Sequence, residues 1–158
     1  DKRKSAYFIV TKNGVIGTGK LKQTSATVAD GGSNIIVLRY ADVLLMLAEC
    51  YAEKDDVSKS NEYLNLIKKR AGIEEVSIGD ATLIKEEIAL ERRKELVNEG
   101  HRWFDLIRTG KAVEVMNAYF TRTPGYTGIT ISELNYVQPI PQGQIDTDSA
   151  TKQNEGYN

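Results

Sequence analysis

Residues 91–108 read ERRKELVNEGHRWFDLIR, a stretch that combines strong helix formers with closely spaced charges of both signs. Side chains four residues apart lie on the same face of an α-helix. This spacing gathers two isoleucines and four glutamates on one face: Ile84, Ile88, Glu87, Glu91, Glu95 and Glu99. Neighbouring like charges repel by about 0.2–0.5 kcal/mol per pair, and an unpaired buried charge costs far more. The stripe therefore predicts an internal network of ion pairs, with Arg39, Arg102 and Arg108 as candidate cations.

The helix expected from Ile35 to about Glu53 is apolar in nearly every direction around its axis, which is typical of a buried helix. Its few polar side chains, Arg39, Asp42 and Glu49, lie close together on the helical wheel, so we expect them to share charges with the glutamate stripe. The predicted network comprises Arg39, Asp42, Glu91, Glu95, Glu99, Arg102 and Arg108. Cys50, the only cysteine, is expected to be a small core residue of this helix.

Further helices are expected along the chain, which makes the predicted fold mainly α. A second helix, from about Ser58 to Ala71, ends at Gly72. With the first helix it forms an antiparallel hairpin of about the size of a tetratricopeptide unit. A third helix follows Asp80 as its N-cap and ends near Gly100. Shorter helices are expected over 101–109 and 112–120, with irregular loops after them.

The N-terminal part is the least helical. Residues 6–11 favour a β-strand, and Asn13-Gly14 after them is a hairpin signal. Residues 30–33 contain two glycines and predict a loop before the first helix. We therefore expect at most a small β element near the N-terminus.

Length and charge narrow the class of protein. The 158 residues are the length of one domain, and we expect a single domain over residues 1–158. Lysines and arginines number 21 against 22 acidic residues, and the net charge of −1 gives no support for nucleic-acid binding. No run approaches about 18 uninterrupted apolar residues, so no segment is expected to span a membrane. Residues 1–4 have no apolar run behind their charges and do not form a signal peptide.

The sequence offers few groups for catalysis or for a cofactor. His101 is the only histidine, and no nucleophile in a sharp turn accompanies it. A carboxylate-bridged metal site needs a second histidine, and one cysteine excludes both an internal disulfide and a cysteine zinc site. Residues 17–20, GTGK, lack the spacing of a Walker A loop. We expect no catalytic site, no metal and no cofactor.

Aromatic side chains are the remaining candidates for ligand binding. Sugars present apolar faces edged by hydroxyls, and an exposed aromatic ring offers a platform for such a face. Tyr119, Tyr126 and Tyr136 lie around the loops after the last predicted helix, and they are the candidate ligand contacts. Trp103, the only tryptophan, lies in the charged stretch and is expected to pack in the core.

Five blocks of the chain, in this order, resemble signatures of the SusD/RagB family: LRYADVLLMLAE at 38–49, KRAGI at 69–73, ERRKEL at 91–96, EGHRWFDLIR at 99–108 and QNEGY at 153–157. The resemblance extends from Asp1-Lys2-Arg3, which is similar to an Asp-Pro-Arg block of the family, to Tyr157. It implies that the chain is the C-terminal portion of a longer protein. It also implies a SusD-like fold with helical hairpins related to tetratricopeptide repeats.

The same resemblance implies a function. Members of the family are surface lipoproteins of Bacteroidetes that bind nutrients, mostly glycans, and are not enzymes. They deliver the ligand to a TonB-dependent SusC-like transporter, and a lipid anchor on the missing N-terminal part would be the only membrane contact. The best-known ligand contacts of the family come largely from parts absent from this chain, so no binding residue is transferred. The alternative is a free-standing helical-repeat adaptor that binds a peptide of another protein.

Overall fold

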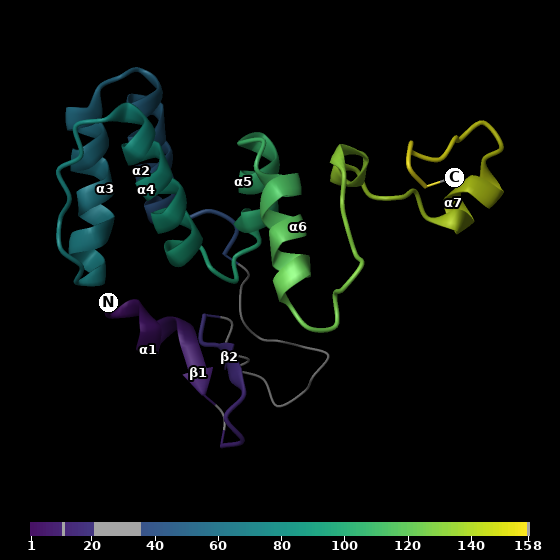
Figure 1. Cartoon of the computed structure of the whole chain (residues 1–158), viewed down its shortest axis with the longest axis horizontal. Helices are drawn as coiled ribbons and strands as arrows, with labels where there is room; N and C mark the ends of the chain where they lie inside the picture. The colour runs from purple at the N-terminus through teal and green to yellow at the C-terminus, as the bar shows by residue number, and fades with distance from the viewer. Residues whose placement is uncertain (11, 21–35, 158) are drawn as a thin grey trace. The chain divides into compact units, whose positions relative to one another are not determined.

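The computed structural model describes residues 1–10, 12–20 and 36–157. These residues form two compact units, Asp1–Arg102 and Trp103–Asn158. The single domain expected over 1–158 stays a prediction. The first unit carries the long helices and the β element, and the second carries shorter helices joined by irregular segments (Figure 1).

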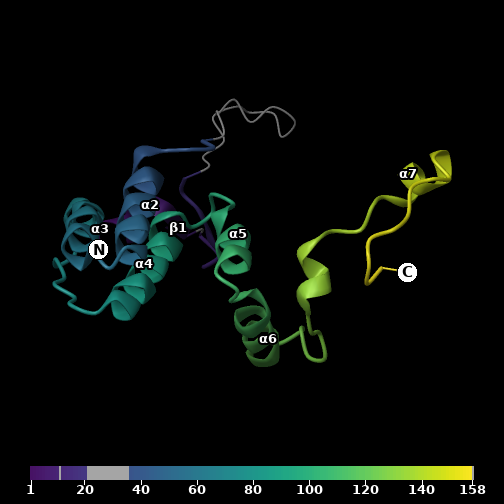
Figure 2. The ribbon, with the colours of Figure 1, turned by 90° about the horizontal axis from the view of Figure 1, so that it is seen from above.

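Three helices form the body of the first unit. They are α2 (Tyr40–Glu53), α3 (Val57–Ala71) and α4 (Ala81–Glu95), and α2 packs against both of the others (Figures 1 and 2). Their facing sides form the main hydrophobic core: Leu44, Leu45, Ala48, Ala52, Leu64, Ile67, Ile84 and Ile88. A spacing of three or four residues places these side chains on one side of each helix. The mainly α fold predicted from the sequence is confirmed.

Local signals fix both ends of α3 and the start of α4. The Asp56 side chain caps α3 by accepting a hydrogen bond from a backbone N–H of its first turn, and Gly72 ends this helix with a left-handed φ of 70°. Asp80 caps α4, because its carboxylate accepts hydrogen bonds from the backbone N–H groups of Thr82 and Leu83. The predicted stop at Gly72 and the predicted N-cap at Asp80 are both confirmed.

Helix α2 begins later than the sequence suggested. It starts at Tyr40, because Arg39 before it has an extended backbone with φ −148° and ψ 159°. Residues 36–38 have no regular structure. The predicted start at Ile35 and the predicted loop over 30–33 lie outside the described residues.

Helix α4 ends at Glu95, five residues before the predicted end near Gly100. Asn98 and Gly100 adopt positive φ values of 64° and 82°, which an α-helix does not accommodate. Residues 96–100 form a turn instead, in which the Glu99 N–H donates to the Leu96 carbonyl at 3.1 Å. The turn places Glu99 beside the end of the helix rather than within it.

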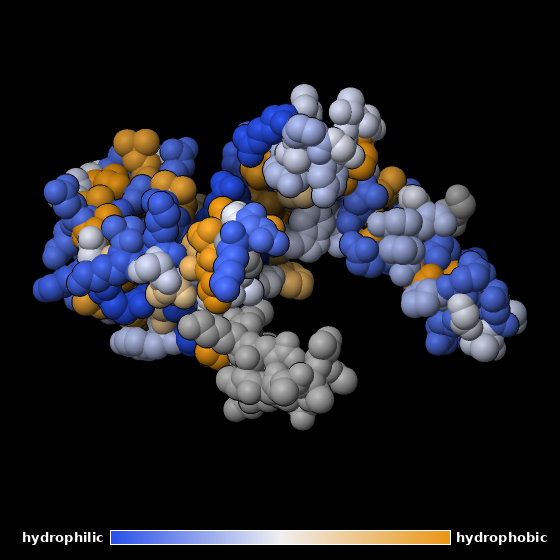
Figure 3. Space-filling model, turned by 90° about the horizontal axis from the view of Figure 1, so that it is seen from below, coloured by the Kyte–Doolittle hydropathy of each residue, from blue (hydrophilic) through white to orange (hydrophobic). Residues whose placement is uncertain are grey.

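One side of α2 is exposed, although the sequence suggested a helix buried all round. Tyr40, Val43 and Met46 are 73%, 40% and 41% exposed, and Cys50 is exposed as well. The prediction that Cys50 is a core residue is therefore wrong. The physical reason is that α3 and α4 pack on only part of the circumference of α2. The face shown in Figure 3 also carries hydrophobic spots, separated by hydrophilic side chains, over the helices of this unit.

A short helix and a β-hairpin precede α2. Helix α1 (Arg3–Tyr7) leads into β1 (Phe8–Val10), which pairs antiparallel with β2 (Ile16–Thr18). The register pairs Phe8 with Thr18, Ile9 with Gly17 and Val10 with Ile16. The predicted small β element is confirmed. Residues 3–7 are nevertheless helical where the sequence suggested a strand from Ala6, and Thr11 lies outside the described residues.

Two asparagines of α3 hold the connection to α4. The Asn61 side chain donates to the Ile78 carbonyl at 2.8 Å and accepts from the Ile78 N–H at 3.0 Å. Asn65 makes the same pair of hydrogen bonds with Val76, at 2.8 and 2.9 Å. We call this arrangement an amide clamp. Each clamp satisfies both backbone polar groups of a residue that has no strand or helix partner.

The second unit contains α5 (His101–Arg108), α6 (Ala112–Arg122), the 3₁₀ turn η1 (Glu133–Tyr136) and α7 (Gln142–Thr147). Helix α5 begins two residues before the boundary between the units. Leu106 and Ala112 are the buried apolar residues of this unit among those the structure describes. The segment predicted to be irregular therefore contains two short helical elements, but it adds no buried apolar side chain.

Amide clamps recur in the second unit. Asn117 of α6 donates to the Ile131 carbonyl at 3.0 Å and accepts from the Ile131 N–H at 2.8 Å. Gln153 makes the corresponding pair with Ile140, at 2.9 and 2.8 Å. These hydrogen bonds fix the two long irregular segments of the unit, where apolar packing is sparse.

Candidate functional site

The carboxylate of Glu95 accepts hydrogen bonds from four side chains. It is fully buried, and its Oε1 accepts hydrogen bonds from Arg39 and Arg70, both at 2.5 Å. The Tyr7 hydroxyl donates to the same oxygen at 3.0 Å, and Arg3 donates to Oε2 at 3.0 Å. A buried carboxylate is tolerated only when it is paired in this way. One side chain thus joins α1, α3, α4 and the residue before α2.

Two further glutamates extend this group, which we call the Glu95 cluster. Glu91 is fully buried and accepts from Arg3 at 2.5 Å. Glu99 accepts from the Nε and Nη2 atoms of Arg39 at 2.7 and 2.9 Å, and it also pairs with Lys20. Fork-shaped contacts of this kind are the geometry in which arginine binds a carboxylate most strongly.

The protonation of these carboxyls follows from their surroundings. Burial alone would raise the pKa of Glu95, because it removes water from the charged form. Hydrogen bonds from Arg39 and Arg3 outweigh burial, and the pKa of Glu95 lies below its ordinary value of 4.5. Burial and two cations, Arg39 and Lys20, act on Glu99 in the same way, and its pKa is also lowered. Both groups are therefore charged at neutral pH.

The structure places the other predicted members of the network at different points. Asp42 pairs with Arg92 at 2.8 Å, and both side chains are buried. Arg108 pairs with Asp105 of its own helix at 2.9 Å, and Arg102 lies in the first turn of α5. Arg39 is thus the predicted cation that the structure brings to Glu95 and Glu99.

Three cations of the Glu95 cluster were missed from the sequence: Arg3, Lys20 and Arg70. Arg3 lies 92 residues from Glu95 and Lys20 lies 79 residues from Glu99, and no helical spacing relates residues so far apart. Arg3 had one signal, since it belongs to the N-terminal block that is similar to a family signature. Each carboxylate of the cluster is bound to at least one cation, although Oε2 of Glu91 is buried without a hydrogen-bond partner.

The aromatic candidates gather in the second unit. The rings of Tyr119 and Tyr126 lie 5.8 Å apart, and Phe120 stacks on Tyr126 at 5.5 Å with an angle of 20° between the rings. Tyr119 and Tyr126 remain 38% and 41% exposed. We call these three residues the aromatic cluster. Tyr136 lies apart from it, edge-on to Trp103 at 6.1 Å, so it shares no platform with the other two tyrosines.

We also searched the part of the chain that the structure describes for a metal site and for a membrane-spanning helix. Within residues 1–10, 12–20 and 36–157, no three histidine, cysteine or acidic side chains come together as a metal site. No helix of that part is long and apolar enough to cross a membrane. His101 is half-buried at the first position of α5.

Residues 1–157 match the sequence profile of the SusD family. The chain belongs to the SusD family. Among SusD relatives, SusD-like protein P38 of Formosa agariphila is 40% identical over 93 residues, which are 53% of this chain and 18% of that protein. SusD-like protein P25 of the same organism is 32% identical over 131 residues, 79% of this chain and 24% of that protein.

Solved structures of SusD proteins agree with this assignment. A SusD superfamily protein of Bacteroides vulgatus is 31% identical with a TM-score of 0.68, and the match covers 78% of this chain and 28% of that one. Surface glycan-binding protein A of Bacteroides uniformis is 29% identical with a TM-score of 0.65, over 77% of this chain and 28% of that one. The matched segments of the chain thus span between 18% and 28% of the length of these four SusD relatives.

Proposed function

We propose that this chain is part of a protein that binds a nutrient, in the first instance a glycan, at the outer surface of the bacterial outer membrane. The match of residues 1–157 to the SusD family carries the proposal. One structural relative is named as a surface glycan-binding protein, which supports a sugar as the ligand class. The full-length protein would be held at the surface by a lipid anchor outside residues 1–158.

The ligand is bound without being cleaved in this proposal. Glycoside hydrolysis needs a carboxylic acid whose pKa is raised, so that it can donate a proton near neutral pH. Glu95 and Glu99 have the opposite property, because arginine contacts lower their pKa values. Their charge is engaged by Arg39 and is not available to a substrate.

Within this chain, Tyr119 and Tyr126 are the proposed contacts to the sugar. Their rings are adjacent and partly exposed, and Phe120 supports the Tyr126 ring from one side. Adjacent rings on a loop and a helix end can receive the apolar face of a sugar while the hydroxyls bond to water or to the protein. Tyr136 is a weaker candidate, because it packs against Trp103.

A SusC-like TonB-dependent transporter is the proposed partner that receives the ligand. The exposed side of α2, with Tyr40, Val43 and Met46, supports contact with another protein surface. The same observation favours the alternative function, a helical adaptor that binds a peptide. Co-purification with an outer-membrane transporter, against capture of a soluble protein, separates the two functions.

Isothermal titration of the full-length protein against a panel of oligosaccharides tests the proposal. We expect saturable binding and, by chromatography, no shortened sugar after prolonged incubation. Tyr126→Ala should weaken binding about tenfold, because a stacking contact contributes about 1–1.5 kcal/mol, whereas Tyr126→Phe keeps the ring and should bind nearly as tightly. Failure of the full-length protein to bind any sugar in the panel, or release of shorter sugars, would contradict it.

A further inference from the structure

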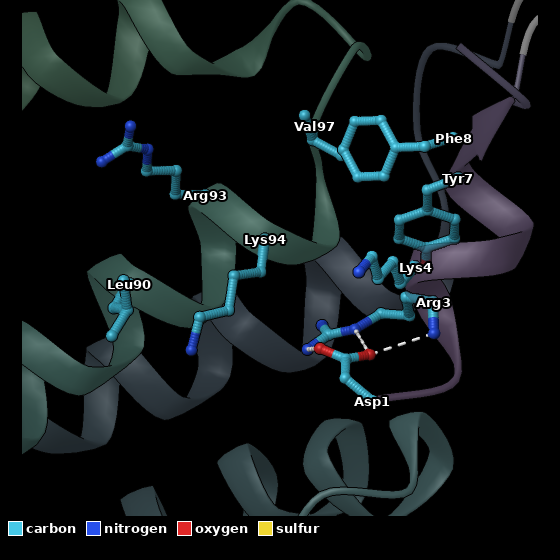
Figure 4. A pocket seen from close by; sticks show the side chains of 9 residues that line it. All are labelled: Asp1, Arg3, Lys4, Tyr7, Phe8, Leu90, Arg93, Lys94 and Val97. Carbon is cyan, nitrogen blue, oxygen red and sulfur yellow. Dashed lines mark hydrogen bonds and ion pairs between the residues drawn. The ribbon is translucent and has the colours of Figure 1, made fainter. Parts of the chain in front are cut away.

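A cavity of about 500 Å³ opens between α4 and the N-terminal segment of the first unit (Figure 4). Apolar side chains line two of its sides. Leu90 and Val97 come from α4 and the turn after it, and Tyr7 and Phe8 come from the end of α1 and the start of β1. In Figure 4 the Phe8 ring and the Val97 side chain point toward each other at one end. A volume of this size accommodates a small organic ligand or one to two sugar units.

Cationic side chains border the same cavity. Arg93 and Lys94 lie on the α4 side, and Lys4 extends toward them from α1 (Figure 4). All three are exposed, and none pairs with a carboxylate among the residues that the structure describes. Most of the other basic residues near α4 differ from them, because those around the Glu95 cluster are bound to glutamates.

The fourth cation in the cavity wall is already neutralised. Arg3 binds Asp1 through two hydrogen bonds of 2.9 and 2.8 Å, and its remaining nitrogen reaches Glu91 and Glu95. Arg3 and Asp1 therefore form a fixed floor that adds no net charge. The free charge at the cavity is positive and comes from Lys4, Arg93 and Lys94.

Helical spacing explains how α4 contributes both to the Glu95 cluster and to the cavity wall. Leu90, Arg93 and Lys94 share a side of α4, because they are separated by three and one residues, and Val97 follows in the turn after the helix. The glutamates at positions 91 and 95 point into the protein from an adjacent side and are fully buried. The stripe that builds the Glu95 cluster thus leaves a second stripe of apolar and basic side chains open to solvent.

We propose that this cavity binds an acidic sugar unit, one that carries a carboxylate or a sulfate group. Lys4 and Lys94 donate hydrogen bonds to the anionic group, Arg93 attracts it only through its charge, and the apolar face of the ring lies against Phe8. Water solvates the three exposed cations in the absence of a ligand, and an anionic sugar gains ion pairs with them that a neutral sugar does not. The inference rests on the proposed glycan function and adds to it a class of substrate and a second binding region in the first unit.

Titration of the full-length protein with three tetrasaccharides tests the inference. The first is a galacturonic acid tetramer, the second is a sulfated tetramer of the carrageenan type, and the third is neutral cellotetraose. We expect an acidic tetramer to bind and cellotetraose not to occupy this cavity, and the first two tetramers show which anionic group is preferred. Binding should weaken as sodium chloride rises from 0.1 to 1 M, because the screening length falls from about 10 Å to about 3 Å.

Variants assign the binding to the cavity. Lys94→Gln and Lys4→Gln each remove one charge from an exposed side chain, and each should weaken the acidic tetramer about tenfold, the effect of losing one charged hydrogen bond. Lys152→Gln makes the same change on an exposed residue of the second unit and should leave the affinity unchanged. Circular dichroism of each variant checks that the fold is retained.

Three results would overturn the inference. Equal binding of the acidic tetramer by the protein and by both cavity variants would place the acidic sugar elsewhere. Equal affinity for sodium sulfate and for the tetramers would show that the cavity holds a free anion rather than a sugar. Binding of cellotetraose alone would remove the acidic class but leave the proposed glycan function intact, whereas binding of no sugar in the wider panel would contradict both.

Discussion

At the scale of single residues, Glu95 decides how the first unit is assembled. Its two oxygens receive four donors from three segments: Arg3 and Tyr7 of α1, Arg39 before α2, and Arg70 of α3. Removal of a buried carboxylate destabilises a fold mainly because the cations around it are left buried without a partner, and an uncompensated buried charge is very costly. The donors around Glu95 are therefore as important as Glu95 itself.

We expect Glu95→Ala to lower the free energy of unfolding by about 3 kcal/mol, near the lower end of the range for broken buried ion pairs. The loss is moderated because Arg39 retains Glu99 and Arg3 retains Glu91. Urea denaturation followed by circular dichroism measures the change. Glu86→Ala, an exposed position of the same helix, is the matched control and should shift the midpoint little. An unchanged midpoint for Glu95→Ala would show that the cluster contributes no net stability.

The lowered pKa values of Glu95 and Glu99 predict a dependence of stability on pH. Unfolding returns both carboxyls to their ordinary pKa of 4.5, so the unfolded chain binds more protons than the folded chain near that pH. The stabilisation is present above pH 4.5. It is lost as the pH falls through the lowered pKa values that Glu95 and Glu99 have in the folded protein. Urea midpoints measured from pH 7 to pH 3 should therefore fall at the acidic end.

The share of this loss that belongs to Glu95 can be separated by substitution. Glu95→Gln cannot titrate, so its midpoint should fall less between pH 5 and pH 3 than that of the unsubstituted protein. Glu86→Gln removes an exposed carboxyl from the same helix and should keep the full pH dependence. Parallel curves for Glu95→Gln and the unsubstituted protein would argue against a lowered pKa at this residue.

At the scale of elements, the end of α3 and the start of α4 were predictable, whereas the start of α2 and the end of α4 were not. Gly72 and Asp80 act through their own backbone or through residues two and three positions away, so the sequence carries the whole signal. The end of α4 depends on the left-handed conformation of Asn98, for which the sequence offers only a preference. Helix α1 has no cap, and Arg3 within it is held by the distant Glu91 and Glu95.

In the candidate sites too, contacts between nearby residues were predictable and contacts between distant residues were not. The sequence placed Tyr119 and Tyr126 in one region because they are seven residues apart across a helix end and a loop, and the structure brings their rings together. Tyr136 lies ten residues further on, and its contact with Trp103 could not be read from spacing. The exposure of Cys50 was also hidden, because an apolar side of a helix does not reveal whether another element covers it.

The cap of α4 gives a prediction at this scale. Asp80→Ala removes the acceptor for the N–H groups of Thr82 and Leu83 and should lower the free energy of unfolding by about 1 kcal/mol. Asp80→Asn keeps a side-chain oxygen and is comparably favourable at an N-cap, so it should restore most of the loss. Thermal unfolding of the unsubstituted protein, Asp80→Ala and Asp80→Asn measures these changes in stability. If alanine and asparagine are equally destabilising, the charge of Asp80 rather than its cap hydrogen bonds matters.

At the scale of the whole molecule, the two units rest on different kinds of interaction. The first unit has the hydrophobic core of α2, α3 and α4, together with the Glu95 cluster. The second has Leu106 and Ala112 as its buried apolar residues within the described part of the chain. Apolar burial is the dominant favourable contribution to folding, so we expect the first unit to be much the more stable of the two.

The amide clamps allow the stabilities of the two units to be compared by hydrogen–deuterium exchange. Four backbone N–H groups outside regular structure, those of Val76, Ile78, Ile131 and Ile140, are bound by asparagine or glutamine side chains. Each can exchange with solvent only when its clamp opens. Val76 and Ile78 should exchange slowly, close to the rates of the buried helices, whereas Ile131 and Ile140 should exchange faster because less apolar packing holds their unit closed. Amide spectra recorded after transfer to deuterated buffer give the four exchange rates. Similar protection at all four N–H groups would mean that the two units open together, in one shared event.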